Sequence, residues 1–279
     1  VVACVEGGCA FQRCERGRYD LDERAENGCE RGLAVQAPEA LGAATDGPWV
    51  DAGPLRVLTA WVDDQGQAVA QLNQERWILD APSPAHPVAR LVNGQPHVGV
   101  LVDDGGGALV RVVRPPDNLR YEHPALGKPA LAEVDGDLVV AHLTPDARLL
   151  VQRVGGALAL SAPGETFDPQ VRPAVLQVGE QVLVVAQRTD GDEPRLVLYT
   201  WEADGLLPSA RALAGLWTGV HLGGYPGRDQ VALSAVQDGR TRWLMGPVAA
   251  LLGDGFMRNG GSSFGQRAYM TPSSFAGPG

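Results

Sequence analysis

The stretch that decides the fold is residues 172–215, which read RPAVLQVGEQVLVVAQRTDGDEPRLVLYTWEADGLLPSARALAG. Short apolar segments alternate in it with turn-forming residues, and its central segment VLVVA is apolar at every position. A strand that is apolar on both faces must be covered on both faces. The stretch therefore predicts antiparallel strands in a sheet that packs between two neighbouring sheets.

Versions of this stretch recur along most of the chain. The openings of five units lie at Pro48, Pro87, Pro129, Pro173 and Thr218. Their successive spacings are 39, 42, 44 and 45 residues. A period in the low forties with four strands per unit is typical of propeller blades. We therefore expect an all-β fold, a β-propeller of about five four-stranded blades. An incomplete six-bladed ring and a two-sheet sandwich are the alternatives.

The strand and turn patterns inside the units support this prediction. The second strand of each unit is a nearly continuous apolar run, at 57–62, 98–102, 138–143, 182–186 and 231–236. Polar and apolar residues alternate instead along the third strand at 195–201, which predicts burial on one face. Asp-Gly occurs seven times and Asn-Gly three times. Because both dipeptides tolerate the positive φ of tight hairpins, they indicate a meander of antiparallel strands.

The ends of the repeat array raise the question of ring closure. A closed ring avoids an open sheet edge when a strand from the opposite terminus completes the last blade. Residues 33–36 and 266–271 are the two candidates. We accordingly expect a cysteine-rich module at 1–32, a linker and closing-strand candidate at 33–47, the propeller at 48–265, and a tail or clasp strand at 266–279.

All the cysteines lie in the first thirty residues, at Cys4, Cys9, Cys14 and Cys29. A module this short does not fold on a hydrophobic core alone, so we expect two disulfides and an oxidising compartment. Three pairings exist, and the sequence does not decide among them. Cys4–Cys14 with Cys9–Cys29 is the pairing we favour. Zinc is disfavoured because the segment has no Cys-x-x-Cys pair and no histidine. A solvated acidic loop is the preferred interpretation of Asp20, Asp22, Glu26 and Glu30, and calcium is the alternative.

The segment 4–30, CVEGGCAFQRCERGRYDLDERAENGCE, resembles the short cysteine-rich modules of secreted and surface proteins of myxobacteria. The matching positions are Cys4, Gly7 or Gly8, Cys9, Cys14, Gly17, Tyr19, Asp20, Asp22, Asn27, Gly28, Cys29 and Glu30. Leu21 stands where many copies carry a further cysteine. The resemblance implies a secreted, cell-surface or periplasmic protein and a spacer or adhesive role, and it implies no activity. Val1 to Cys4 also resemble the end of a lipoprotein cleavage box, which makes a lipidated Cys4 the alternative to a disulfide.

Charge excludes some partners. The formal net charge is −10, and no run of basic residues exists, so the electrostatic footprint of a nucleic-acid partner is missing. No apolar run approaches the length of a membrane span.

Candidate catalytic patterns are weak. Residues 261–265 match G-x-S-x-G, but neither a histidine nor an acid follows them. For a propeller glycosidase the candidate acids are Asp51 and Glu133, and a structural role is preferred for both. The five histidines (His86, His97, His123, His142, His221) fall at different registers and are expected to be structural. The six tryptophans (Trp49, Trp61, Trp77, Trp201, Trp217, Trp243) are expected to pack between blades, with sugar stacking as the alternative.

The tail at 253–279 is rich in glycine and serine yet carries Phe256, Phe264, Tyr269 and Phe275. These aromatic residues favour an arm that docks on this propeller or on a second subunit. We therefore predict a non-catalytic structural or protein-interaction module without a cofactor, a subunit of an extracellular assembly or filament. A carbohydrate-binding, lectin-like propeller is the alternative, and a glycoside hydrolase ranks last.

Overall fold

The computed structural model describes residues 2–5, 8–11, 18–19, 31–32, 44–53, 56–115, 118–202, 205–224 and 230–249. The chain divides into two compact units, Val1–Gly42 and Ala43–Gly279. In the first unit β1 (Val2–Val5) pairs with β2 (Gly8–Phe11), and β3 (Arg18–Tyr19) pairs with β4 (Arg31–Gly32), both antiparallel. The β1–β2 register sets Cys4 opposite Cys9 along the backbone.

The cysteine side chains lie outside the described residues, as do Cys14 and Cys29 altogether. The same holds for the calcium candidates Asp20, Asp22, Glu26 and Glu30. The disulfide and calcium predictions therefore stay predictions.

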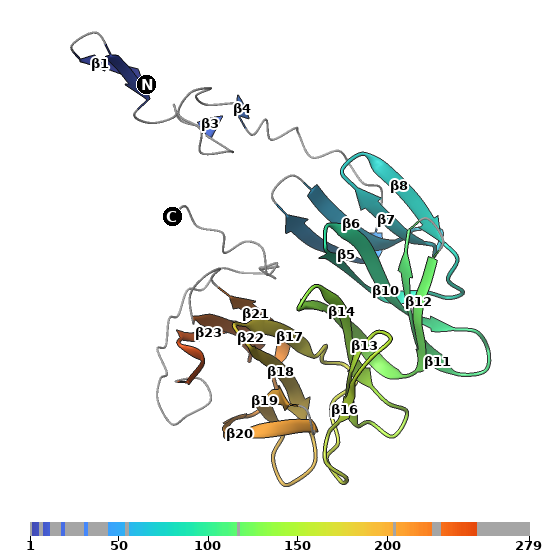
Figure 1. Ribbon diagram of the computed structural model, residues 1–279. Helices are drawn as coiled ribbons and strands as arrows, with labels where there is room; N and C mark the ends of the chain where they lie inside the picture. The colour runs from blue at the N-terminus through green and yellow to red at the C-terminus, as the bar shows by residue number, and fades with distance from the viewer. Residues whose placement is uncertain are drawn as a thin grey trace. The chain divides into compact units, whose positions relative to one another are not determined.

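The second unit consists of sheets that follow one another along the chain (Figure 1). The first contains β5 (Ala44–Gly53), β6 (Arg56–Asp63), β7 (Ala68–Leu72) and β8 (Glu75–Leu79). The second contains β9 (Ala85–Val92), β10 (Gln95–Asp103), β11 (Ala108–Arg114) and β12 (Asn118–Pro124). The third contains β13 (Leu126–Val134), β14 (Asp137–Leu143), β15 (Leu149–Arg153) and β16 (Leu158–Leu160). The fourth contains β17 (Ala174–Val178), β18 (Gln181–Arg188), β19 (Arg195–Glu202) and β20 (Gly205–Ala214). The fifth has three strands within the described residues, β21 (Thr218–Gly224), β22 (Val231–Gln237) and β23 (Arg240–Gly246).

This arrangement is a five-bladed β-propeller, as the repeat predicts, and not a two-sheet sandwich. All strand pairs within the blades are antiparallel and sequential. The innermost strands are β5, β9, β13, β17 and β21, and each of the first four contacts the next inner strand along the chain. The first blade begins at Ala44, so residues 44–47 belong to it rather than to a linker.

Hydrogen bonds between blades reproduce the period of the sequence. The side chain of Asp51 accepts from Leu91 N–H, 40 residues away, and Glu133 accepts from Asn93 N–H, also 40 residues away. Gln177 accepts from Asp135 N–H across 42 residues. The inner strands thus lie side by side in matching register, one repeat apart.

Among the described residues, buried apolar side chains form four layers, one between each two blades that follow one another along the chain. Strand β18 shows why the second strands are apolar throughout. Val182, Val184 and Ala186 belong to the layer that faces the third blade. Leu183 and Val185 belong to the layer that faces the fifth. Because alternate side chains point to opposite faces, both residue sets need an apolar environment.

The one-sided burial predicted for the third strand at 195–201 is wrong for its central part. Leu196, Val197, Leu198 and Tyr199 are all buried in β19. Val197 and Tyr199 pack toward the third blade, and Leu196 and Leu198 toward the fifth. The neighbouring blades therefore cover the third strand as well as the second.

Several sequence predictions lie outside the described residues. They concern the closing strands at 33–36 and 266–271, the G-x-S-x-G segment at 261–265, and the tail aromatics Phe256, Phe264, Tyr269 and Phe275. Within the described part, no helix has the length and apolarity that crossing a membrane requires.

Candidate functional site

The first residues of the inner strands bring together polar and aromatic side chains from several blades. Asp46 and Trp49 lie on β5, His86 near the start of β9, and His221 on β21. Arg172 lies just before β17. We call these five residues the axial cluster, because their strands are the innermost of their blades.

Asp46 and His86 form the first contact of the cluster. One carboxylate oxygen of Asp46, Oδ2, accepts from the backbone N–H of His86 at 2.6 Å and lies 3.2 Å from its Nδ1. The hydrogen bond from the His86 side chain holds the pKa of Asp46 at about 2, so the carboxylate stays ionised. His86 adopts a φ of 53°, an uncommon conformation for a non-glycine residue. The bonds to Asp46 stabilise the backbone in that conformation.

Arg172 extends from the fourth blade to the first and second. Its Nη2 donates to the backbone carbonyls of His86 and Pro87, at 3.1 Å each. Its guanidinium lies over the indole ring of Trp49, 4.4 Å from the ring centroid. This cation–π contact and the two hydrogen bonds fix the plane of the guanidinium. Burial lowers the pKa of Arg172 to about 10, and the Asp46 carboxylate acts in the opposite direction.

His221 joins the fifth blade to the first. Its imidazole stacks on the indole of Trp49, with 5.8 Å between ring centroids and 30° between planes. Burial lowers the pKa of His221 to about 4, and the nearby Arg172 cation lowers it further. The imidazole is therefore neutral at pH 7, with one nitrogen as donor and the other as acceptor.

The connection at 161–173, between β16 and β17, positions Arg172. The backbone N–H of Asp168 donates to the carbonyl of Gln187 at 2.9 Å, and that of Val171 to the carbonyl of Asp168 at 3.1 Å. On its other side, the connection packs against Gly127, where an added Cβ would lie 2.8 Å from the Cα of Pro169. Backbone contacts on two sides thus hold the segment that carries Arg172.

A buried ion network anchors the start of the same connection. Arg188 donates through Nη1 to Glu165 at 2.7 Å and through Nε to Asp190 at 2.9 Å. Tyr199 donates its hydroxyl to the other oxygen of Glu165 at 3.4 Å. Both carboxylates already share one guanidinium, and the hydrogen bonds that Arg188 donates to Asp190 raise the pKa of Arg188. The network is therefore a structural anchor rather than a candidate site.

The two acids considered for glycosidase chemistry have structural contacts. Asp51 is 5% exposed and accepts from Leu91 N–H at 2.7 Å, with Arg90 Nη1 at 3.5 Å from its other oxygen. Glu133 accepts from Asn93 N–H at 3.2 Å. Both lie near the last residues of their strands, whereas Asp46 and His86 of the axial cluster lie near the first residues of theirs.

The remaining histidines lie away from the cluster. His142 is fully buried, its Nε2 lies 2.8 Å from the hydroxyl of Tyr121, and burial lowers its pKa to about 4. His123 packs against both rings. His97 lies on β10, and burial lowers its pKa. Among the described residues no group of three or more histidine, cysteine, aspartate and glutamate side chains has metal-binding geometry.

Most tryptophans confirm the packing prediction. Trp217 is buried between the fourth and fifth blades, and Trp77 and Trp201 pack against core layers. Trp61 is 1% exposed, with Arg76 over its ring at 5.1 Å. Trp49 differs because it packs against two core layers and also contacts Arg172 and His221. The side chain of Trp243 lies outside the described residues.

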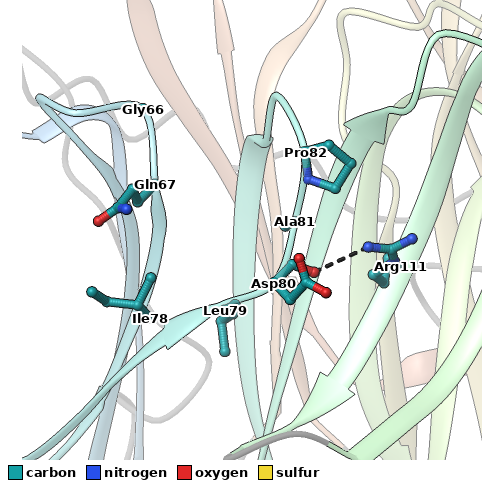
Figure 2. Close-up of a pocket in the computed structure, with 8 residues that line it drawn as sticks. All are labelled: Gly66, Gln67, Ile78, Leu79, Asp80, Ala81, Pro82 and Arg111. Atoms are coloured by element: carbon teal, nitrogen blue, oxygen red, sulfur yellow. Dashed lines mark hydrogen bonds between the residues drawn. The ribbon is translucent and has the colours of Figure 1, made fainter.

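A surface groove of 650 Å³ lies at the outer rim, between the first and second blades (Figure 2). Its lining residues are Gly66, Gln67, Ile78, Leu79, Asp80, Ala81, Pro82 and Arg111. Arg111 donates to the backbone carbonyl of Asp80 at 3.0 Å and to Glu122 at 3.3 Å. Arg111 thus joins the edges of two blades, and we take the axial cluster as the candidate site.

Sequence reasoning missed Asp46, His86 and Arg172 as site residues. A pattern was present, because His86, Lys128 and Arg172 each directly precede the proline that opens a unit. His86, Lys128 and Arg172 thus occupy one register of successive repeats, which places nitrogen-bearing side chains at one end of the inner strands.

The comparisons with known proteins find only distant structural likeness. No protein-family model matches the sequence, and no curated protein matches it. An α-L-arabinofuranosidase from Lactobacillus brevis is 12% identical, covering 70% of this chain and 82% of its own, with a TM-score of 0.40. An α-L-arabinofuranosidase from Clostridium thermocellum is 11% identical, with 68% and 81% coverage and a TM-score of 0.41. BBS1N, solved in complex with ARL6DN, is 12% identical, with 72% and 78% coverage and a TM-score of 0.41. The likeness is one of fold alone.

Proposed function

We propose that this chain is a non-catalytic, carbohydrate-binding propeller whose ligand binds at the axial cluster. The observation that carries the proposal is the cluster itself. It combines an ionised carboxylate and a neutral imidazole on inner strands with a fixed guanidinium, that of Arg172, two residues before β17. The side chains of Asp46 and His86 are 38% and 33% exposed, so a ligand can reach them. A few convergent polar groups beside an aromatic ring are typical of small-ligand sites.

The chemistry of the carboxylates supports binding over hydrolysis. Paired-carboxylate glycosidases need a general acid with a raised pKa and a second carboxylate within about 10 Å. Asp46 has a lowered pKa, and Asp51 and Glu133 are bonded to the backbone of the second blade. The propellers of similar fold include glycosidases and a protein bound to another protein, so they favour neither activity.

The test is a glycan array probed with the full chain, followed by a hydrolysis assay on every glycan that is bound. We expect binding that is lost in His221→Ala, retained in His123→Ala, and unaccompanied by release of sugar. His123 is the matched control, because it is a histidine in contact with aromatic rings outside the cluster. Sugar release by the wild type, abolished in Asp51→Asn or Glu133→Gln, would show an enzyme instead. An array without binding would remove the proposal.

A second candidate function, assembly with other subunits, rests on the fifth blade. Within the described residues its sheet has three strands, whereas each of the other four blades has four. We propose that a strand from residues 266–271, of the same chain or of a second copy, completes it. Light scattering after size exclusion tests this: higher-order species that disappear on deletion of residues 254–279 support assembly. A monomer with and without those residues contradicts it.

We further propose that the protein works in an oxidising compartment, outside the cell or in the periplasm. The four clustered cysteines support this proposal. Intact-mass analysis after alkylation, with and without reductant, should show four alkylated cysteines only after reduction. Alkylation without reductant would contradict the proposal.

A further inference from the structure

One hydrogen-bonding group of the axial cluster has no acceptor. Nη1 of Arg172 is sealed from solvent and has no hydrogen-bond partner, although Nη2 of the same guanidinium has two. A buried donor without an acceptor is costly and calls for an explanation such as a bound ion or ligand. Because the guanidinium plane of Arg172 is fixed, an acceptor for Nη1 would have to lie in that plane, along the N–H direction.

The charge around Arg172 also leaves room for an anion. With a pKa of about 10, its guanidinium stays protonated at pH 7. Asp46, the carboxylate that acts on it electrostatically, already accepts both donors of His86. No carboxylate among the described residues makes an ion pair with Arg172. A buried charge without an ion-paired counter-charge is stabilised when an anionic ligand binds.

The neighbouring groups restrict which anion fits. Asp46 is ionised and close enough to influence Arg172, so a dianionic phosphate would meet repulsion that a singly charged carboxylate meets less. His221 is neutral and offers one donor and one acceptor, as hydroxyl groups require. Arg172 thus suits a single carboxylate, and His221 suits hydroxyl groups. The cluster as a whole therefore suits a ligand that combines one carboxylate with hydroxyls.

We propose that the axial cluster binds a carboxylate-bearing saccharide, such as a chain of uronic acids. Its carboxylate accepts from Nη1 of Arg172, and its hydroxyls meet His221 and the exposed parts of Asp46 and His86. This inference rests on the proposed function and specifies its ligand.

The test is isothermal titration calorimetry of the full chain with three oligosaccharides of equal length. They are an oligogalacturonate, its methyl ester and the neutral oligogalactose. We expect the free acid to bind on the order of 30-fold more tightly than the ester, the change that follows loss of a buried charge pair. Arg172→Gln should remove this preference and leave the weaker ester binding in place. Arg195→Gln, at an exposed arginine on β19, is the matched control and should bind as the wild type does.

The outcomes separate the two proposals. Equal binding of acid and ester overturns the carboxylate inference but leaves the carbohydrate function standing. Failure of all three sugars, together with an empty glycan array, overturns the proposed function itself. If Arg172→Gln fails to fold, the affinities of the wild-type chain for the free acid and for the ester still decide whether the site recognises a carboxylate. Tight binding of a peptide carboxylate with no binding of the oligogalacturonate also overturns the inference.

Discussion

The inner strands carry charged and polar side chains at both ends, and the two ends use them differently. Near the last residues, Asp51, Glu133 and Gln177 each accept from a backbone N–H of an adjacent blade, about one period away. Near the first residues, Arg172 instead contacts His86 and Pro87 of the second blade, 86 and 85 residues away in sequence, and one of its donors has no acceptor. The regular contacts, one period apart, indicate a joint between adjacent blades. The contacts of Arg172 span two periods and leave its Nη1 without an acceptor, which is what we expect of a binding site.

The largest expected effect concerns the segment that carries Arg172. Gly127→Ala adds a methyl group at a φ of 88° and against the backbone of Pro169. The left-handed conformation alone costs about 1–2 kcal/mol, and the clash should bring the loss of unfolding free energy above about 3 kcal/mol. Urea denaturation measures it. Gly155→Ala is the control, because Gly155 has a φ of 78° with nothing within 4 Å. Equal losses in both variants would show that the connection does not press on Gly127.

We expect an intermediate effect for the pH dependence of stability, which depends on two histidines whose pKa burial lowers. The pKa of His142, inside a blade junction, and of His221, in the axial cluster, are both about 4. Below pH 6.5 the unfolded chain binds protons that the folded chain does not, so stability falls as the pH drops from 6.5 toward 4. For the fully buried His142 the loss is about 3 kcal/mol. His142→Gln should flatten the pH profile of the unfolding free energy, and His123→Gln should not.

The ligand distinguishes the two histidines. An anion bound beside Arg172 should raise the pKa of His221 and leave that of His142 unchanged, which an NMR titration of the imidazole protons measures. A ligand that moves both values, or only that of His142, would place binding outside the axial cluster.

The smallest effect tests the joint at the other strand end. Asp51→Ala leaves the N–H of Leu91 without its acceptor and should cost about 2 kcal/mol of unfolding free energy. Asp64→Ala, at an exposed turn, should cost less than about 0.5 kcal/mol. Saccharide binding should survive in both variants. If Asp51→Ala folds normally yet no longer binds the sugar, the assignment of one strand end to blade contacts and of the other to ligand binding is wrong.

The repeat made the fold predictable from the sequence. The axial cluster was not predictable, because its contacts do not follow the repeat. The apolar runs such as 182–186 show the period directly, because each residue needs an apolar layer on its own side. The contact between Arg172 and Trp49 leaves no such pattern, since it joins unlike positions of two blades that are not consecutive. Trp49 itself resembles the other tryptophans in sequence, and its contacts with Arg172 and His221 distinguish it in the structure.

The division of β18 between two core layers also limits how this chain can evolve. A one-residue insertion within the strand would exchange Val184 with its neighbours and turn every following side chain toward the wrong layer. Both blade junctions would lose their fit at once. Insertions at the turns, such as the one at Gly155 where the surroundings are open, leave both layers in register. Length differences between repeats, 39 to 45 residues here, are therefore expected to accumulate between strands and almost never inside the second strand.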